Sequence, residues 1–205
     1  MLRTTLATLA VGVAAAGPPA ALLKPAALSA NAPAAYTVEF TTTKGIFDVA
    51  VQRSLAPRGA DRFYNLVRAR FYDGVELFRV IPGFVVQFGI SGYPAVSKAW
   101  QNATIKDDPV KTSNVRGTIT FADAGPASRT TQVFVNLANN ASLDGQTFSP
   151  FGRVTRGMSV IASLYSGYGD DPTNAQGSIE SQGNAFLKKQ FPRLDSVLTA
   201  RIVSH

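Results

Sequence analysis

Few residues of this chain have side chains that commonly carry out chemistry. It contains no cysteine, and its single histidine, His205, is the last residue. Thiol nucleophiles, thiolate metal sites and disulfides are therefore excluded, and a histidine-based triad or zinc site would have to use the end of the chain. Among the charged residues, Arg79 lies inside an apolar run, between Phe78 and Val80. A guanidinium in such surroundings needs a partner, which is either a structural ion pair or a polar group of a ligand.

The composition is that of a globular protein. The chain has 205 residues, of which 45% are hydrophobic and 16% charged, and its mean hydropathy is +0.06. This balance excludes a disordered chain, a collagen-like repeat and a long coiled coil, and the length suits one domain with a leader. The formal net charge is +7. We expect no nucleic-acid partner, because the basic residues are dispersed and form no stripe interleaved with aromatic residues.

The first residues have the pattern of a secretory signal. Met1-Leu2-Arg3 is followed by an uncharged stretch, residues 4–16, that is rich in Leu, Ala and Val. Such a pattern predicts a signal peptide, and the stretch is shorter than the ~20 residues that span a bilayer. Small-x-small cleavage motifs end at Ala16, Ala30 and Ala34.

From this pattern we expect a signal peptide and Ala/Pro-rich leader over residues 1–34 and one domain over residues 35–205. We also expect no stable membrane span, and export to a periplasm, an endomembrane lumen or the cell exterior. The alternative interpretation of the leader is a disordered arm.

Alternating apolar and polar residues predict mostly strands. Residues 36–42 and 46–52 alternate in this way on either side of a short turn, which predicts an antiparallel hairpin. Helical spacing predicts one helix that begins at Pro57 and a second helix over residues 158–165. Many short strands with two helices suggest a closed antiparallel barrel, which has no exposed edges. Further strands are expected over residues 76–81, 84–89, 116–122, 132–137, 151–155 and 197–203.

A long polar segment interrupts this pattern before the last strand. Residues 166–190 are rich in Gly, Ser, Asn and Gln, which predicts a surface loop that ends in a short helix over residues 185–190. Loops of this length often carry function. A decorative insertion is the favoured interpretation, and a functional loop is the alternative.

Several ordered blocks of sequence resemble a known family. Residues 71–74 are Phe-Tyr-Asp-Gly, and residues 77–89 are Leu-Phe-Arg-Val-Ile-Pro-Gly-Phe-Val-Val-Gln-Phe-Gly. Together they resemble the signature of the cyclophilin-type peptidyl-prolyl cis-trans isomerases. The likeness spans nearly all of the chain after the leader. It continues in order through residues 116–126, 131–136, 142–145, 151–154 and 191–195.

The resemblance implies a mainly β fold, a closed eight-stranded antiparallel barrel capped by two helices, and an enzyme that accelerates rotation about X–Pro bonds. It places the catalytic role, stabilisation of the twisted amide, on Arg79. It implies no cofactor and no metal, and the expected partners of a monomer are proline-containing peptides and unfolded proteins. The substrate-binding residues that it implies are Phe78, Phe84, Gln87, Ala122, Asp123, Gln132, Phe134 and Leu143.

The chain departs from the family pattern at several positions. Leu77-Phe78 stands where the family has Phe-His, Phe88-Gly89 where it has a glycine pair, and Ile90 where an aspartate is usual. Ser142 stands where some members have an aromatic residue or a histidine. Because the arginine and the residues of the proline pocket are kept, we expect turnover with an altered peptide preference. The alternative is a proline-peptide-binding module with low or no activity on the same barrel. For each aromatic residue or leucine of the pocket, a place in the barrel core is the competing interpretation.

Overall fold

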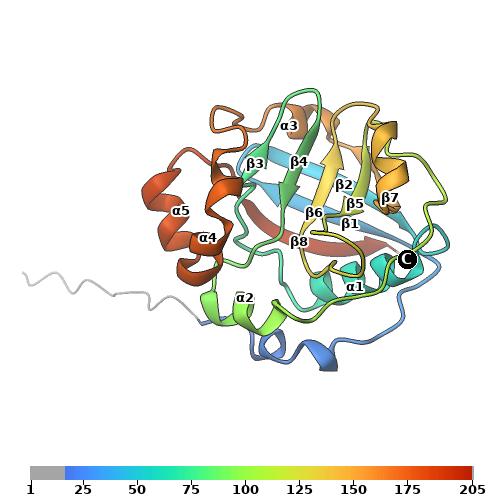
Figure 1. Cartoon of the computed structure of the whole chain (residues 1–205), viewed down its shortest axis with the longest axis horizontal. Coiled ribbons are helices and arrows are strands. Elements are labelled where there is room, and N and C mark those ends of the chain that lie inside the picture. Colours follow the sequence, from blue (N-terminus) through green and yellow to red (C-terminus); the bar gives the residue numbers. More distant parts are fainter. Residues whose placement is uncertain (1–16, 205) are drawn as a thin grey trace, which may run out of the picture.

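The computed structural model describes residues 17–204, in which one antiparallel sheet of eight strands curls into a half-barrel (Figure 1). Along the sheet the strands follow the order β3-β4-β6-β5-β7-β2-β1-β8. The mainly β class and the eight antiparallel strands expected from the sequence are confirmed. The bounds are β1 Ala35–Thr42, β2 Gly45–Gln52, β3 Arg79–Val80, β4 Val85–Phe88, β5 Thr118–Phe121, β6 Val133–Asn136, β7 Pro150–Arg156 and β8 Val197–Ser204.

The barrel does not close through a continuous strand ladder. β3 and β8 stand at the two ends of the strand order, and the chain before each of them meets at an isolated bridge between Glu76 and Ser196. Two backbone hydrogen bonds of 2.8 Å join Val197 to the segment that precedes Glu76. The strand predicted over residues 76–81 is short for this reason, because its first residues pair with the chain before β8 instead of following β4.

The hairpin of β1 and β2 confirms the alternation seen in the sequence. Phe40 and Phe47 are directly opposite in its register and fully buried, and their rings stack 4.8 Å apart. One face of each strand fills the core while the other remains polar. The predicted helix α1, Pro57–Arg68, adds Phe63, whose ring lies 5.0 Å from that of Phe151 in β7.

Helices lie around the sheet and none of those within residues 17–204 is long and apolar enough to cross a membrane. α1 and α3 correspond to the two helices predicted from helical spacing, α5 corresponds to the short helix predicted over residues 185–190, and α2 and α4 are additional. The helix bounds are α1 Pro57–Arg68, α2 Pro94–Trp100, α3 Met158–Ala162, α4 Gln176–Gln182 and α5 Asn184–Gln190.

Residues 166–190 are largely helical, so the prediction of a surface loop is wrong. A 3-10 turn, Asp171–Ala175, leads into α4 and α5, and Figure 1 shows these two helices together at the β3 edge of the sheet. Ile179 and Leu187 are buried beneath them. Of these two helices only α4 was missed, because its seven residues bury a single apolar side chain and are too short to show a clear helical period. We call residues 166–190 the helical insertion.

Residues 17–34, which the sequence assigned to the leader, pack against α1 and α2; we call them the N-terminal strap. The side chain of Leu22 is 2% exposed, and its carbonyl oxygen accepts a 2.8 Å hydrogen bond from Trp100 Nε1. The side-chain amide of Asn65 makes hydrogen bonds of 2.7 and 3.2 Å with the backbone of Ala30. The strap is therefore part of the folded domain, whereas the signal motif before it lies outside the described residues.

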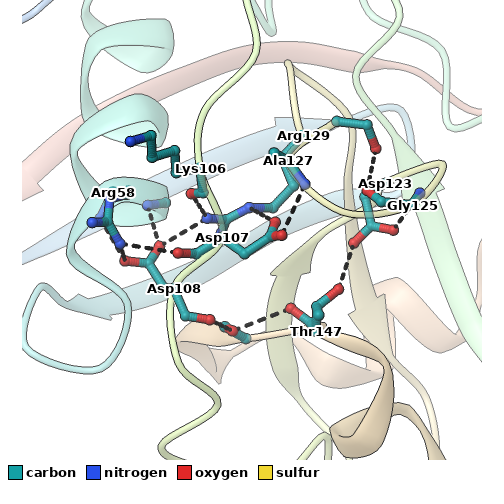
Figure 2. A network of polar contacts seen from close by, with 12 residues as sticks. Arg58, Lys106, Asp107, Asp108, Asp123, Gly125, Ala127, Arg129 and Thr147 are labelled. Atoms are coloured by element: carbon teal, nitrogen blue, oxygen red, sulfur yellow. Dashed lines mark hydrogen bonds and ion pairs between the residues drawn. The ribbon is translucent and has the colours of Figure 1, made fainter.

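A buried ion network fixes the loop that follows β5 (Figure 2). The 1% exposed side chain of Arg129 lies between two carboxylates, with Nη2 3.1 Å from Asp108 Oδ2 and Nε 3.3 Å from Asp107 Oδ1. Asp108 also accepts the Gly59 N–H at 2.9 Å, at the start of α1, where a negative charge suits the helix dipole. Asp107 accepts the Ala127 N–H at 2.8 Å. One buried arginine thus ties the start of α1 to the loop after β5.

The first prediction concerns the N-terminal strap. Replacement of a fully buried leucine leaves a cavity, so we expect Leu22→Ala to lower the free energy of unfolding by about 2–5 kcal/mol. Leu23 is 44% exposed, and Leu23→Ala should change it by less than about 0.5 kcal/mol. Urea unfolding of the two variants and the wild type measures both values. Equal stability of the two variants would show that the strap does not pack on the domain.

The second prediction concerns the buried network. Arg129→Ala leaves two carboxylates without their cation, and the expected loss of unfolding free energy is about 3–5 kcal/mol. The matched control is Arg58→Ala, because the Arg58 side chain is 53% exposed and lies 3.8 Å from the same Asp108. An exposed pair contributes about 0–1 kcal/mol. The same denaturant titration compares them, and a loss below 1 kcal/mol for Arg129→Ala would contradict the assignment.

Candidate active site

Three neighbouring strands place Arg79, Gln87 and Phe134 in one row across the sheet. Arg79 of β3 pairs with Gln87 of β4, which pairs in turn with Phe134 of β6. Residues directly opposite in an antiparallel pair lie on the same face of the sheet. The turn between β3 and β4 is tight, with φ of +74° at Gly83, a conformation that glycine adopts without strain. The apolar run noted in the sequence therefore folds back on itself and sets the guanidinium beside the Gln87 amide.

A cavity of about 120 Å³ lies at this row. Its walls combine a guanidinium, an amide and a carboxylate with a set of apolar side chains. Apart from Phe78 and Gln132, the structure brings all of the sequence-predicted site residues together here. The residues that line the cavity are Arg79, Phe84, Val85, Gln87, Ala122, Asp123, Phe134, Leu143 and Phe148.

The Arg79 side chain is held by three neighbours. Its Nε donates to Asp170 Oδ1 at 2.5 Å, and its Nη1 donates to Gln87 Oε1 at 3.0 Å. The guanidinium carbon lies 5.6 Å from the centroid of the Phe84 ring. The side chain is 22% exposed and also lines the cavity. The guanidinium therefore forms an ion pair and also lines the cavity.

Aromatic rings form the apolar wall of the cavity. The rings of Phe134 and Phe148 meet edge to face with their centroids 5.5 Å apart. Phe134 is buried, whereas Phe84, Leu143 and Phe148 are half-buried and keep apolar surface toward the cavity. A small apolar ring would gain free energy by entering it. Sequence analysis missed Val85 and Phe148; the signal for Phe148 is an aromatic residue between polar neighbours just before β7.

Gln132 and Asp123 contribute polar groups. Gln132 Oε1 accepts a 2.9 Å hydrogen bond from Gln87 Nε2, so Gln132 supports the cavity without lining it. Its backbone carbonyl accepts the Ala122 N–H at 3.0 Å, which removes this N–H from contact with a peptide. The Asp123 carboxylate lines the cavity. Burial raises its pKa above the ordinary value, and the Gly125 N–H that donates to it acts in the opposite direction.

Phe78 does not reach the cavity, so the structure does not bring the expected peptide contact to the site. Its side chain is 1% exposed and packs with Ile90, Ile179 and Leu187 in a second apolar cluster. Phe78 directly precedes Arg79, and consecutive side chains of an extended chain point to opposite sides. Phe78 and Ile90, two of the departures from the family pattern, therefore lie beneath the helical insertion rather than in the cavity.

A larger cavity of about 810 Å³ lies elsewhere, between the ends of β1, β2 and β7. Its lining includes Arg53 and Arg153, but Arg53 is already paired with Asp61 at 2.7 Å. It shares no lining residue with the cavity at Arg79. Within residues 17–204, no group of three or more acidic or histidine side chains is placed to hold a metal ion. Of these two cavities, the smaller one at Arg79 is therefore the candidate active site.

Comparison with known sequences identifies relatives over most of the chain. The family model described as cyclophilin type peptidyl-prolyl cis-trans isomerase/CLD matches residues 37–184. A peptidyl-prolyl cis-trans isomerase of Acinetobacter baylyi is 31% identical over 181 residues, which cover 85% of this chain and 93% of that protein. Peptidyl-prolyl cis-trans isomerase A of Dickeya dadantii is 38% identical over 138 residues, which cover 62% of this chain and 70% of that protein.

Solved structures share the fold. The crystal structure of a cyclophilin type peptidyl-prolyl cis-trans isomerase of Cryptosporidium parvum has a TM-score of 0.61 and 17% identity, and the match covers 83% of this chain and 99% of that one. The same protein crystallised in the presence of the dipeptide Ala-Pro has a TM-score of 0.60. These structures support the fold, and the sequence matches support the relationship. This chain therefore belongs to the family of cyclophilin-type peptidyl-prolyl cis-trans isomerases.

Proposed function

We propose that this chain accelerates rotation about X–Pro bonds through the guanidinium of Arg79, and that its substrates are unfolded segments of exported proteins. The observation that carries the proposal is the position of this side chain. Its guanidinium forms one wall of a cavity of about 120 Å³ whose other walls include Phe84, Phe134 and Leu143. The small apolar cavity can hold a proline ring while the cation beside it reaches the prolyl nitrogen.

The reaction itself asks little of the enzyme in covalent terms. Rotation about an X–Pro bond breaks amide resonance, with a barrier of about 20 kcal/mol and an unaided time of tens of seconds. The catalyst has to bind the twisted amide better than either planar form. In the twisted state the prolyl nitrogen regains a lone pair, which accepts a hydrogen bond from a positioned cation. No thiol, histidine, cofactor or metal is needed for this step.

One N–H group of Arg79, on Nη2, is available to donate a hydrogen bond to that lone pair. Its Nε and Nη1 are engaged by Asp170 and Gln87, and within residues 17–204 its Nη2 donates to no protein group. A guanidinium stays protonated and keeps its N–H groups in a fixed fork. While the proline ring rests against Phe134, the residue before it can turn about the amide bond.

Export is supported by the signal pattern over residues 1–16, and the N-terminal strap favours one of the three cleavage motifs. A cut after Ala30 or Ala34 would remove Leu22 from the core and leave the Trp100 Nε1–H without its acceptor. A cut after Ala16 would leave the whole strap in place. We therefore propose that the exported protein begins at Gly17.

The third prediction tests the role of Arg79. Loss of a transition-state donor commonly costs about 10²–10³-fold in rate, so Arg79→Ala should lower the catalysed isomerisation rate of a short Ala-Pro peptide by about 10²-fold. Arg153→Ala, which removes an exposed arginine on β7, should retain the wild-type rate. Circular dichroism checks that both variants are folded.

Two outcomes would contradict this proposal in different ways. Equal rates for Arg79→Ala and wild type would remove Arg79 from the centre of the mechanism but leave the activity. No acceleration by the wild type, across several residues before the proline, would instead indicate the proline-peptide-binding module.

The fourth prediction concerns processing. The full chain, expressed in a host that exports it, should yield a product whose intact mass corresponds to residues 17–205. A product that begins at residue 31 or 35 would show that the strap is dispensable, and an unprocessed chain would contradict the export proposal. Mass spectrometry of the purified protein distinguishes these results directly.

A further inference from the structure

We propose that Asp170, carried by the helical insertion, is a positioning residue that orients the guanidinium of Arg79 for catalysis. The inference rests on the isomerase function proposed above, and it concerns a residue that does not line the cavity. It assigns a role to residues 166–190, which composition alone had marked as a decorative loop.

The helical insertion is firmly attached to the barrel. Ile179 of α4 and Leu187 of α5 are 0% and 2% exposed, and they pack with Phe78 and Ile90 of the barrel. Asn184 adds two hydrogen bonds, of 3.2 Å from its backbone N–H and 2.7 Å from its Nδ2, to backbone carbonyl oxygens of the barrel. Apolar burial and hydrogen bonds together fix the place from which Asp170 reaches the site.

A chain of hydrogen bonds crosses the site from Asp170 to Gln176, and Arg79 is the donor to both of its neighbours. Arg79 donates through Nε to Asp170 Oδ1 and through Nη1 to Gln87 Oε1. Gln87 Nε2 donates to Gln132 Oε1 at 2.9 Å, and Gln132 Nε2 donates to Gln176 Oε1 at 3.0 Å. Because a guanidinium can only donate, it sets the orientation of each amide that follows. The first and last members belong to the insertion, which therefore holds both ends of the chain.

The exposure of Asp170 and Arg79 indicates that their ion pair holds the guanidinium in position and adds little to the stability of the fold. The side chains of Asp170 and Arg79 are 57% and 22% exposed. Pairs this exposed contribute little to the free energy of folding. A second anchor on the guanidinium does matter for catalysis, because an arginine held at Nη1 alone can rotate about that bond. When Nε is held as well, the plane of the guanidinium is fixed, and so is the direction in which Nη2 points.

The fifth prediction separates the acceptor from the charge. Asp170→Ala removes the acceptor of the Nε–H and should lower kcat for an Ala-Pro peptide about tenfold, with the peptide Kd unchanged. Asp170→Asn keeps an oxygen acceptor and should restore most of the activity. Asp171→Ala is the matched control, because it removes the neighbouring exposed carboxylate, and it should match the wild type. All three variants should unfold at the wild-type denaturant midpoint.

Two activity results would overturn the inference while leaving the proposed function intact. One is an Asp170→Ala variant as fast as an active wild type. The other is an Asp170→Asn variant as slow as Asp170→Ala, which would mean that the hydrogen bond to Nε is not what matters.

A second measurement does not depend on turnover, so it also applies if the wild type proves inactive and the proposed function fails. The Nε–H resonance of Arg79, assigned by its loss in Arg79→Lys, should exchange slowly with water in the wild type. Asp170→Ala should shift this resonance and speed its exchange, whereas Asp171→Ala should not. An unchanged resonance in Asp170→Ala would overturn the positioning role.

Discussion

One positive charge at the edge of an apolar sheet is the constraint on which the rest of the site depends. The Arg79 guanidinium cannot lie in the barrel core without partners, because an unpaired ion is expensive to desolvate. At 22% exposure it is bound on one side by Gln87 and Asp170, and its other side borders the cavity. Such a place strengthens its hydrogen bonds relative to those in water and still leaves room for a substrate. The short β3, the tight turn after it and the pairing with β4 all serve this placement.

Two of the positions that depart from the family pattern lie in the second apolar cluster. Phe78 and Ile90 occupy positions where the family has histidine and aspartate, and both are buried against Ile179 and Leu187 of the helical insertion. A polar side chain at either position would lose water beneath the insertion without gaining a partner. Phe78 and Ile90 form part of the surface on which the helical insertion packs. Neither residue lines the cavity, whose walls contain Arg79 and the apolar side chains of Phe84, Phe134 and Leu143.

Sequence patterns predicted elements with a clear period or a clear apolar run, and they missed α2, α4 and the contacts between distant residues. β1 alternates over eight residues and α1 repeats over twelve, so their periods are clear. α4 buries only Ile179 among seven residues, which leaves no period to detect. Phe134 and Leu143 could be assigned to one pocket only through the family resemblance. No pattern could pair Arg79 with Asp170, 91 residues away, or show that Leu22 in an Ala/Pro-rich stretch is covered by Trp100.

Two of the arginine ion pairs, those of Arg129 and Arg79, show how exposure decides what an ion pair does. The side chains of Arg129 and Asp108 are each 1% exposed, so breaking their ion pair would leave two unpaired charges in the interior. The pair therefore holds α1 and the loop after β5 in a fixed arrangement. Arg79 and Asp170 are 22% and 57% exposed, so water can compensate when a hydrogen bond there rearranges. A guanidinium as buried as that of Arg129, which is 1% exposed, could not reach a nitrogen that becomes an acceptor only in the twisted state. Catalysis of the proposed kind therefore requires an arginine that the fold holds in position while one of its N–H groups stays free to donate to the substrate.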